Sequence, residues 1–311
     1  MKHINILLFA LTIGIGFSSC SSDEKPSGDS IFKGTVVNRD NLDTWLLMNY
    51  TYPYNIDFKY KMEDIESDMK YHLVPADSAK AAKLAIIVKY LWMDAYNEVT
   101  SADFIKANVP RQIHLIGSPA YNSEGTMVLG TAEGGLKVTL YMVNSLTPEM
   151  LADYATLTDY YFHTMHHEFT HILNQKKPYN PDYNRITEKY YMSGDWYQYD
   201  IPGDPIDPYA LHRGFISAYS MSEGLEDFAE MLSVYVTSSV ADWNKMMAEA
   251  EKGETGLDLG KNITGRTFIE EKLSIVRRYM QDYWKIDIDQ LRDAVNRRGS
   301  ELGDLDLEHL N

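Results

Sequence analysis

Residues 159–175 read DYYFHTMHHEFTHILNQ and contain the pattern His167-Glu168-Phe169-Thr170-His171. Residues four apart lie on one face of an α-helix, so His167 and His171 can bind one metal ion together. Glu168 lies about 100° further around the helix and can reach a water on that ion. Zinc lowers the pKa of such a water towards about 7, where a carboxylate can take its proton. The pattern predicts one Zn²⁺ ion held by both histidines, with Glu168 as general base of a hydrolase.

The apolar residues of this stretch favour a helix with two different faces. Phe162, Met165, Phe169 and Ile172 recur at helical spacing and form one apolar stripe, while the two histidines fall on roughly the opposite side. We therefore expect the stripe to be buried and the histidines to face a cleft. The alternative is a solvated helix with incidental histidines.

Two further histidines lie next to the motif. His163 and His166 flank the motif and are expected to be solvated. His163 lies one turn before His167, so a place in the outer shell of the metal site is the alternative.

A third metal ligand has to come from elsewhere in the chain. The extended motif with a glycine and a third histidine is absent, because Asn174 and Lys177 occupy those positions. Glu226 lies on a predicted helix over 222–237 and is the expected third ligand. Glu230, one turn further, suits a supporting role in which it orients a histidine through its free ring nitrogen.

The same helical wheel assigns the neighbours of Glu226. It places Leu225 on the buried face and turns Asp227 away from the site. The alternative for these acidic residues is a solvated helix flank.

A helix with two histidines followed by a helix with a glutamate resembles the gluzincin arrangement of zinc peptidases. Residues 218–230, AYSMSEGLEDFAE, resemble a segment of the anthrax lethal factor catalytic domain, in which a tyrosine precedes the ligand glutamate by seven residues. The resemblance implies that Tyr219 stabilises the developing oxyanion. It covers roughly residues 159–237, and Asp227 stands where that domain has an aromatic residue.

The first thirty residues predict export and lipidation. Residues 4–17 are uncharged and mostly apolar, and they precede Ser18-Ser19-Cys20, which contains the only cysteine of the chain. Residues 1–19 are typical of a lipoprotein signal peptide, with Cys20 as the lipidated residue and residues 20–30 as a polar, flexible tether. A plain secretory signal with an incidental cysteine is the alternative.

The signal together with the histidine motif resembles the substrate import-associated zinc metallohydrolase lipoproteins of Bacteroidetes. That resemblance implies a surface-exposed outer-membrane lipoprotein, a peptide or protein substrate, and an outer-membrane nutrient importer as partner. The formal net charge of −16 argues against nucleic acid and against anionic membrane surfaces as partners, so membrane contact is expected only through the lipid.

Residues 31–311 are expected to form one zincin-like α+β domain, with a small antiparallel sheet followed by a mainly helical C-terminal part. A Gly134-Gly135 turn is expected to join the last two strands as a hairpin. The expected strands cover 112–116, 126–129 and 136–143. The expected helices cover 77–99, 101–107, 159–175, 222–237, 241–251, 268–284 and 288–297, and a further helix starts at Thr147-Pro148.

The sequence leaves the roles of one strand, one loop and one histidine undecided. The strand over 136–143 could be a sheet edge that pairs with an extended peptide. The tyrosine-rich loop over 176–212 could bind peptides or sugars, or pack against its own domain. The role of His212 is also open. A lipoprotein that captures peptides or glycans without cleaving them, and a purely structural zinc, are the alternatives to an enzyme; the intact Glu168 and the missing fourth protein ligand weigh against them.

Overall fold

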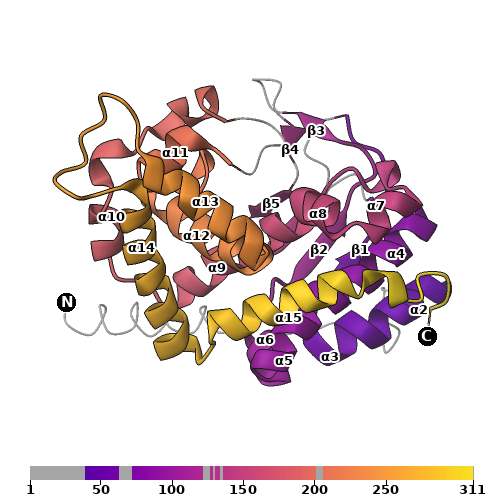
Figure 1. Cartoon of the computed structure of the whole chain (residues 1–311). Coiled ribbons are helices and arrows are strands. Elements are labelled where there is room, and N and C mark those ends of the chain that lie inside the picture. Colours follow the sequence, from indigo (N-terminus) through magenta and orange to yellow (C-terminus); the bar gives the residue numbers. More distant parts are fainter. Residues whose placement is uncertain are drawn as a thin grey trace, which may run out of the picture. The chain divides into compact units, whose positions relative to one another are not determined.

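The computed structural model describes residues 39–62, 72–121, 127–128, 130–133, 136–200 and 206–310. The chain divides into two units, Met1–Arg39 and Asp40–Asn311, and the account below concerns the second (Figure 1). The predicted signal peptide, Cys20 and the tether lie outside the described residues. Among the helices that are described, none combines the length and apolarity needed to span a membrane.

The domain contains one four-stranded sheet in the order β1-β2-β6-β5. Its strands are β1 (Asp57–Lys59), β2 (Gln112–Leu115), β6 (Lys137–Leu140) and β5 (Gly130–Glu133). A separate two-stranded sheet pairs β3 (Ala120–Tyr121) with β4 (Met127–Val128). The α+β class is confirmed.

The expected antiparallel arrangement holds for only one pair of the larger sheet. β1 pairs with β2 and β2 with β6 in parallel, whereas β5 and β6 are antiparallel. The last three residues of both β2 and β6 are buried, so these strands are covered on both faces, as parallel strands usually are. Parallel pairing depends on crossover connections between distant segments, which local periodicity does not reveal.

The prediction that residues 136–143 form one strand of a hairpin is confirmed by β6, but its partner is β5 and not the strand predicted over 126–129. β5 pairs antiparallel with β6 from Glu133↔Lys137 to Gly130↔Leu140, while the strand expected over 126–129 appears as β4 and pairs with β3. Gly134 and Gly135 lie outside the described residues. The interpretation of 136–143 as an edge strand is wrong, because β6 lies between β2 and β5, and the two edge strands are β1 and β5.

Helices make up most of the remaining domain and follow the sequence predictions closely. The α-helices are α2 (Asn41–Leu46), α3 (Tyr52–Tyr54), α4 (Ser78–Val88), α5 (Asp94–Val99), α6 (Ala102–Asn108), α7 (Pro148–Ala152), α8 (Tyr154–Leu157), α9 (His163–Lys176), α10 (Asp182–Arg185), α11 (Pro208–His212), α12 (Gly224–Thr237), α13 (Val240–Lys252), α14 (Gly265–Tyr279) and α15 (Ile288–Ser300). Short π-helical turns are η1 (Leu47–Thr51), η3 (Lys89–Met93), η5 (Thr158–Phe162) and η9 (Met280–Trp284). Short 3₁₀ turns are η4 (Val143–Ser145), η6 (Glu188–Tyr190), η7 (Ser193–Gln198), η8 (Tyr219–Met221) and η10 (Leu302–Asp304).

Local capping explains several of the helix starts. Asp77, Ser101 and Thr147 each accept a hydrogen bond from the backbone N–H three residues later, which satisfies a free donor of the first turn. The helix predicted over 77–99 runs through α4, η3 and α5 without a break in sequence.

The helix that carries the histidine motif is anchored in the core by aromatic packing. The Phe169 ring of α9 meets Trp92, Tyr96 and Phe104 edge to face, with ring centroids 5.3, 5.0 and 6.0 Å away. Such contacts add to the hydrophobic gain from burial and fix the rotation of a helix about its axis. The expected apolar stripe is therefore confirmed as the buried side of α9.

Candidate metal centre

Helix α12 packs against α9 and brings three potential ligands together. The Nε2 atoms of His167 and His171 are 3.0 Å apart, and they lie 2.8 and 3.2 Å from Oε2 of Glu226. Side chains that lie four and 55 residues apart in the sequence therefore meet at one point. Glu226 lies in the first turn of α12.

This donor set fits zinc in both chemistry and spacing. Two imidazoles and one carboxylate are ligands that zinc accepts, and they leave a fourth position free. Tetrahedral ligands about 2.0–2.2 Å from zinc stand roughly 3.3–3.6 Å from each other, a few tenths of an ångström more than the separations observed here. Small side-chain rotations are enough to open the set around an ion.

The electrostatics of the cluster show that it is arranged for a positive charge. Burial alone would lower the pKa of His167, but its contacts with Glu226 and Glu230 outweigh that effect and raise this pKa to about 10. Burial alone would raise the pKa of Glu226, yet the hydrogen bonds from His167 and His171 hold it far below its usual range. The same carboxylates that favour a proton on His167 would favour a cation bound among these side chains.

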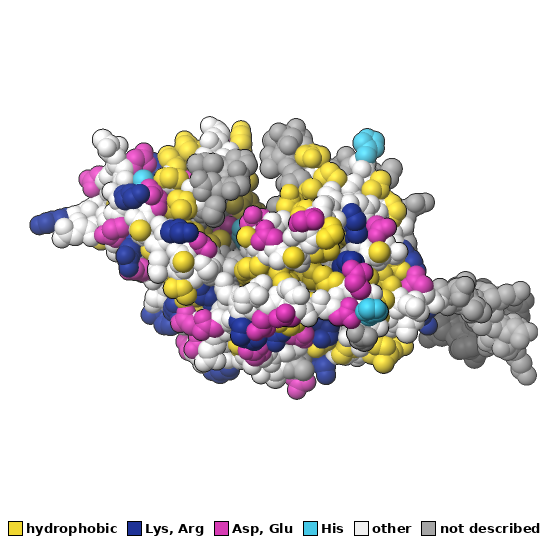
Figure 2. All heavy atoms as spheres, turned by 45° about the vertical axis from the view of Figure 1, so that its right-hand side comes forward, with side chains coloured by type: hydrophobic (Ala, Val, Ile, Leu, Met, Phe, Trp, Pro, Cys, Tyr) yellow, Lys and Arg dark blue, Asp and Glu magenta, His cyan; other side chains and the backbone are white. Residues whose placement is uncertain are grey.

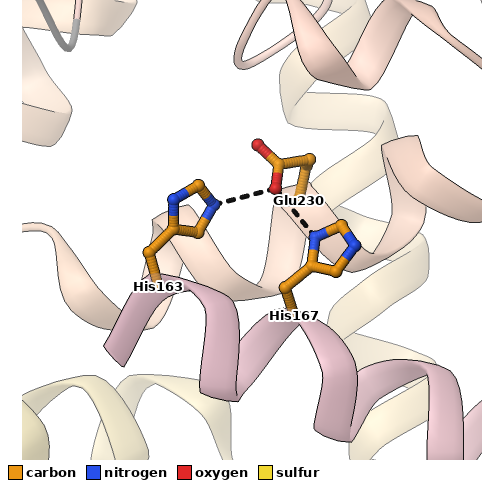
Figure 3. Close-up of side chains that lie close together, drawn as sticks. All are labelled: His163, His167 and Glu230. Carbon is orange, nitrogen blue, oxygen red and sulfur yellow. Dashed lines mark hydrogen bonds and ion pairs between the residues drawn. The ribbon is translucent and has the colours of Figure 1, made fainter. Parts of the chain in front are cut away.

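Glu230 organises the far side of the first histidine. Its Oε1 lies 2.8 Å from Nδ1 of His167 and 2.8 Å from Nε2 of His163, and both rings point toward it from α9 (Figure 3). The hydroxyl of Ser217 donates to Oε2 over 2.6 Å. A hydrogen bond from Nδ1 of His167 to Glu230 leaves the Nε2 lone pair directed at the proposed metal position.

The expectation of solvation is wrong for His166 and holds only in part for His163, whose side chain is 36% exposed. His163 shares the buried carboxylate of Glu230, which matches the outer-shell alternative. His166 is fully buried, and its Nδ1 lies 3.1 Å from the Tyr96 hydroxyl. Burial, together with the nearby His163, lowers the pKa of His166 to about 3, so this ring is neutral.

Glu168 lies beside the ligand cluster and faces a cavity. The cavity has a volume of about 480 Å³, and its lining includes Glu168, His171 and Glu226. Burial raises the pKa of Glu168; the two histidines oppose this rise, and the nearby Glu226 and Glu230 carboxylates support it. A carboxylate with a raised pKa is a better proton acceptor than an exposed one.

Tyr219, in η8, also lies beside the cluster. Its ring centroid is 5.7 Å from that of His167, and Trp196 packs edge to face against it at 4.9 Å. Burial and the adjacent, hydrogen-bonded Glu226 raise the pKa of Tyr219 well above its usual value. Tyr219 is therefore a neutral hydroxyl close to the proposed metal position.

The helical wheel of α12 is wrong for Leu225, and it did not predict the burial of Asp227, although Asp227 does point away from the metal cluster. Asp227 is buried and pairs with the buried Lys272 of α14 at 2.6 Å, while the hydroxyls of Tyr183 and Tyr191 also donate to it. Leu225 is half exposed and lines the cavity instead of the core. A helical wheel assumes one buried side, but α12 is packed on one flank by α9 and on another by α14.

The tyrosine-rich segment over 176–212 packs to a large extent against its own domain. Tyr179 stacks on Phe228 of α12 with ring centroids 4.1 Å apart, and Tyr199 stacks on Tyr209 at 3.8 Å. Nε2 of His212 lies 3.1 Å from Oε1 of Glu249 and so links α11 to α13.

The site also contains residues that the sequence analysis did not single out. Ser217 and Trp196 carry no motif, and their roles depend on contacts with Glu230 and Tyr219 that only the fold creates. Asn174 stands where the extended motif has a glycine, and helical spacing places it one turn after His171, on the same side as the motif.

Comparison with known proteins places the chain in a family. A solved structure described as a "putative zinc-binding metallo-peptidase", from Bacteroides caccae, is 42% identical to this chain and superimposes with a TM-score of 0.72. The alignment covers 91% of this chain and all of the solved one. No curated protein matches the chain significantly. Residues 35–289 match the family described as "Putative zinc-binding metallo-peptidase", and the chain belongs to that family.

Proposed function

We propose that this protein is a zinc-dependent peptidase in which His167, His171 and Glu226 hold the metal. The observation that carries the proposal is the convergence of these three side chains next to Glu168, at one end of a cavity. Membership of a family of zinc-binding metallopeptidases supports the assignment to zinc hydrolases.

When bound there, zinc would lower the pKa of water and polarise a substrate carbonyl. Glu168 accepts the proton of the attacking water on its carboxylate and then delivers it to the leaving amine. Tyr219 donates a hydrogen bond from its hydroxyl to the oxyanion that develops on the carbonyl oxygen and keeps its proton. Glu230 keeps His167 in the tautomer whose Nε2 is free to bind the metal.

An extended peptide has a suitable backbone partner in β5. This strand is one of the two edge strands of the sheet, and it packs against α9, which carries the histidine motif. Unpaired N–H and C=O groups on a sheet edge can pair with an added strand. We therefore expect residues 130–133, and not residues 136–143, to pair with an extended substrate.

Metal analysis combined with a mixed peptide library tests the proposed function. Wild-type protein should bind one equivalent of zinc and cleave peptides, and Glu168→Gln should retain zinc but lose cleavage. Glu271→Gln, an exposed position on α14, serves as the matched control and should behave like wild type. Zinc binding without cleavage by the wild type would instead identify a capture protein.

We further propose that the protein is attached by a lipid on Cys20 to the outer membrane and faces outward, beside a nutrient importer. The signal-like residues 1–19 and the tether over 20–30 support this location. Cys20→Ala should abolish metabolic labelling with a fatty acid and release the protein from membranes. Labelling that persists without the cysteine would contradict the lipid anchor.

A further inference from the structure

The turn that carries Tyr219 is closed by a pair of serines. The Ser220 hydroxyl donates to the carbonyl oxygen of Ser217 over 2.6 Å and accepts a hydrogen bond from the N–H of Ser217 over 3.2 Å. In return, the Ser220 N–H donates to the hydroxyl oxygen of Ser217 over 3.1 Å. Serine side chains that bond to nearby backbone groups stabilise tight turns. These three hydrogen bonds fix the backbone on both sides of Tyr219.

Ser217 also contacts the candidate metal centre, through its hydroxyl proton. The hydroxyl donates to Oε2 of Glu230 over 2.6 Å, while Oε1 of the same carboxylate lies 2.8 Å from His163 and from His167. The terminal torsion of a glutamate has only broad preferences, so one bonded oxygen leaves the carboxylate free to rotate. Hydrogen bonds to both oxygens fix its plane, and a hydrogen bond to an anion is stronger than one between neutral groups. Ser217 therefore helps to set the direction of the bond between Glu230 and His167.

A second route from Ser217 to the same histidine passes along the backbone. Tyr219 lies two residues after Ser217, and its ring centroid is 5.7 Å from that of His167. The Tyr219 hydroxyl shares a hydrogen bond with Glu226. Ser217 is thus bonded to two parts of the site. Its hydroxyl reaches the carboxylate that orients His167, and its backbone belongs to the turn that holds Tyr219.

The end of η8 is held by contacts that do not involve Ser217. The N–H of Met192 donates to the carbonyl oxygen of Met221 over 2.7 Å. The hydroxyl of Ser222 donates to the carbonyl oxygen of Tyr219, also over 2.7 Å. The turn should therefore keep its path when the Ser217 hydroxyl is removed. What the hydroxyl adds is the link between the turn and α12.

We propose that Ser217 is a positioning residue that couples Tyr219 to the metal ligand His167 through the carboxylate of Glu230. The hydroxyl holds the carboxylate in the plane that His167 requires, and it holds the turn at the distance that Tyr219 requires. The inference rests on the proposed function for the part played by Tyr219, whereas the link to the metal ligand can be tested by zinc binding alone.

Zinc affinity tests the link through Glu230. Ser217→Ala should weaken zinc binding about tenfold, the lower end of the effect expected when the support behind a metal-ligating histidine is lost. Competition with a fluorescent chelator measures the affinity, and denaturant titration shows that the variant is folded. Ser239→Ala removes a serine hydroxyl that caps α13 and should bind zinc like wild type.

A double-mutant cycle separates positioning from a general effect on stability. In a Glu230→Gln background, Ser217→Ala should change zinc affinity by no more than about twofold, because the carboxylate that the hydroxyl orients is already gone. A serine that acts only on the stability of the turn would weaken zinc binding by the same factor in both backgrounds, and that result would overturn the link.

The coupling to Tyr219 should appear in the kinetics of the zinc-loaded protein. Ser217→Ala should lower kcat about tenfold with KM within about twofold of wild type, because the substrate is bound as before while the donor to the oxyanion is misplaced. In a Tyr219→Phe background, the same substitution should lower kcat by no more than about twofold further, since that donor is absent. An equal loss of kcat in both backgrounds would contradict the coupling.

The outcomes keep the positioning role and the peptidase apart. Cleavage by the wild type, with zinc affinity and kcat unchanged in Ser217→Ala, overturns the positioning role and leaves the peptidase intact. Zinc affinity that falls in Ser217→Ala while the wild type cleaves no peptide supports the link to His167 and overturns the peptidase together with the coupling to Tyr219. Unchanged affinity and no cleavage overturn both.

Discussion

At the scale of single residues, the chemistry depends on one buried carboxylate that touches no substrate. Glu230 is only 2% exposed and accepts hydrogen bonds from His163, His167 and Ser217. Burial alone would raise the pKa of Glu230, but the two histidines hold it well below its usual range, so the group is a fixed anion. This anion sets the tautomer and the orientation of His167.

Replacing Glu230 by Gln should weaken zinc binding by about 10–100-fold, because an amide is a poorer acceptor for His167 and removes the negative charge. Competition with a fluorescent chelator measures the affinity. Glu271→Gln is the control on an exposed helical position. Unchanged affinity in Glu230→Gln would show that the carboxylate does not support the metal ligand.

Tyr219 is proposed to stabilise the oxyanion, so its effect should appear in kcat and not in zinc affinity. Tyr219→Phe removes one hydroxyl donor from the oxyanion and should lower kcat by about 10²–10³-fold, while zinc affinity and KM stay close to wild type. Steady-state kinetics on a cleaved library peptide, together with metal titration, provide the comparison. A loss of zinc instead of a loss of kcat would reassign Tyr219 to the metal ligands.

At the scale of elements, α12 carries Glu226 and Glu230 on one flank and is fixed on another by a buried ion pair. Lys272 of α14 pairs with Asp227 at 2.6 Å, donates to the Gly214 carbonyl at 2.9 Å, and lies 3.9 Å from the centre of the Phe215 ring. Both charged side chains are fully buried. The pair therefore fixes how α12 is rotated relative to α14.

Breaking that pair should destabilise the domain strongly. Lys272→Met leaves Asp227 buried without its cation and should cost about 3–5 kcal/mol of unfolding free energy, measured by denaturant titration of the metal-free protein. Lys245→Met breaks an exposed pair with Asp242 on α13 and should cost no more than about 1 kcal/mol.

Adding Asp227→Asn to Lys272→Met should recover part of the loss, because the stranded charge is removed. Equal, small effects of the two lysine substitutions would contradict a role for the buried pair in holding α12.

The helices could be predicted from the sequence, whereas the pairing of distant segments could not. Helical periodicity predicted α9 and α12 to within a few residues, and the motif spacing identified His167, His171 and Glu226, which lie together. The parallel pairing of β1 with β2 was not predicted, because β1 has only three residues and its partner lies more than fifty positions away. The partner of Asp227 was missed for the same reason, since Lys272 belongs to a distant helix.

At the scale of the whole domain, the proposed metal site lies where separate segments meet. The ligands come from α9 and α12, Tyr219 comes from η8, and the edge strand β5 packs against α9 (Figure 1). Acidic, basic and apolar side chains are interspersed on the face drawn in Figure 2, so the net charge of −16 is not gathered into one patch there. This face therefore offers no single charged patch to a partner.

Because the ligands lie on two helices, a bound ion should stabilise the folded domain as a whole. Zinc at a thousandfold excess over its Kd adds about 4 kcal/mol to the unfolding free energy. In a domain of this size that corresponds to a rise in Tm of roughly 8–16 °C, measured by calorimetry with zinc and after chelation. Glu168→Gln should show the full rise because Glu168 is not a ligand, and His171→Ala should lose most of it. An equal rise in His171→Ala would place the ion elsewhere, for instance between His163, His167 and Glu230, which also lie close enough to hold one.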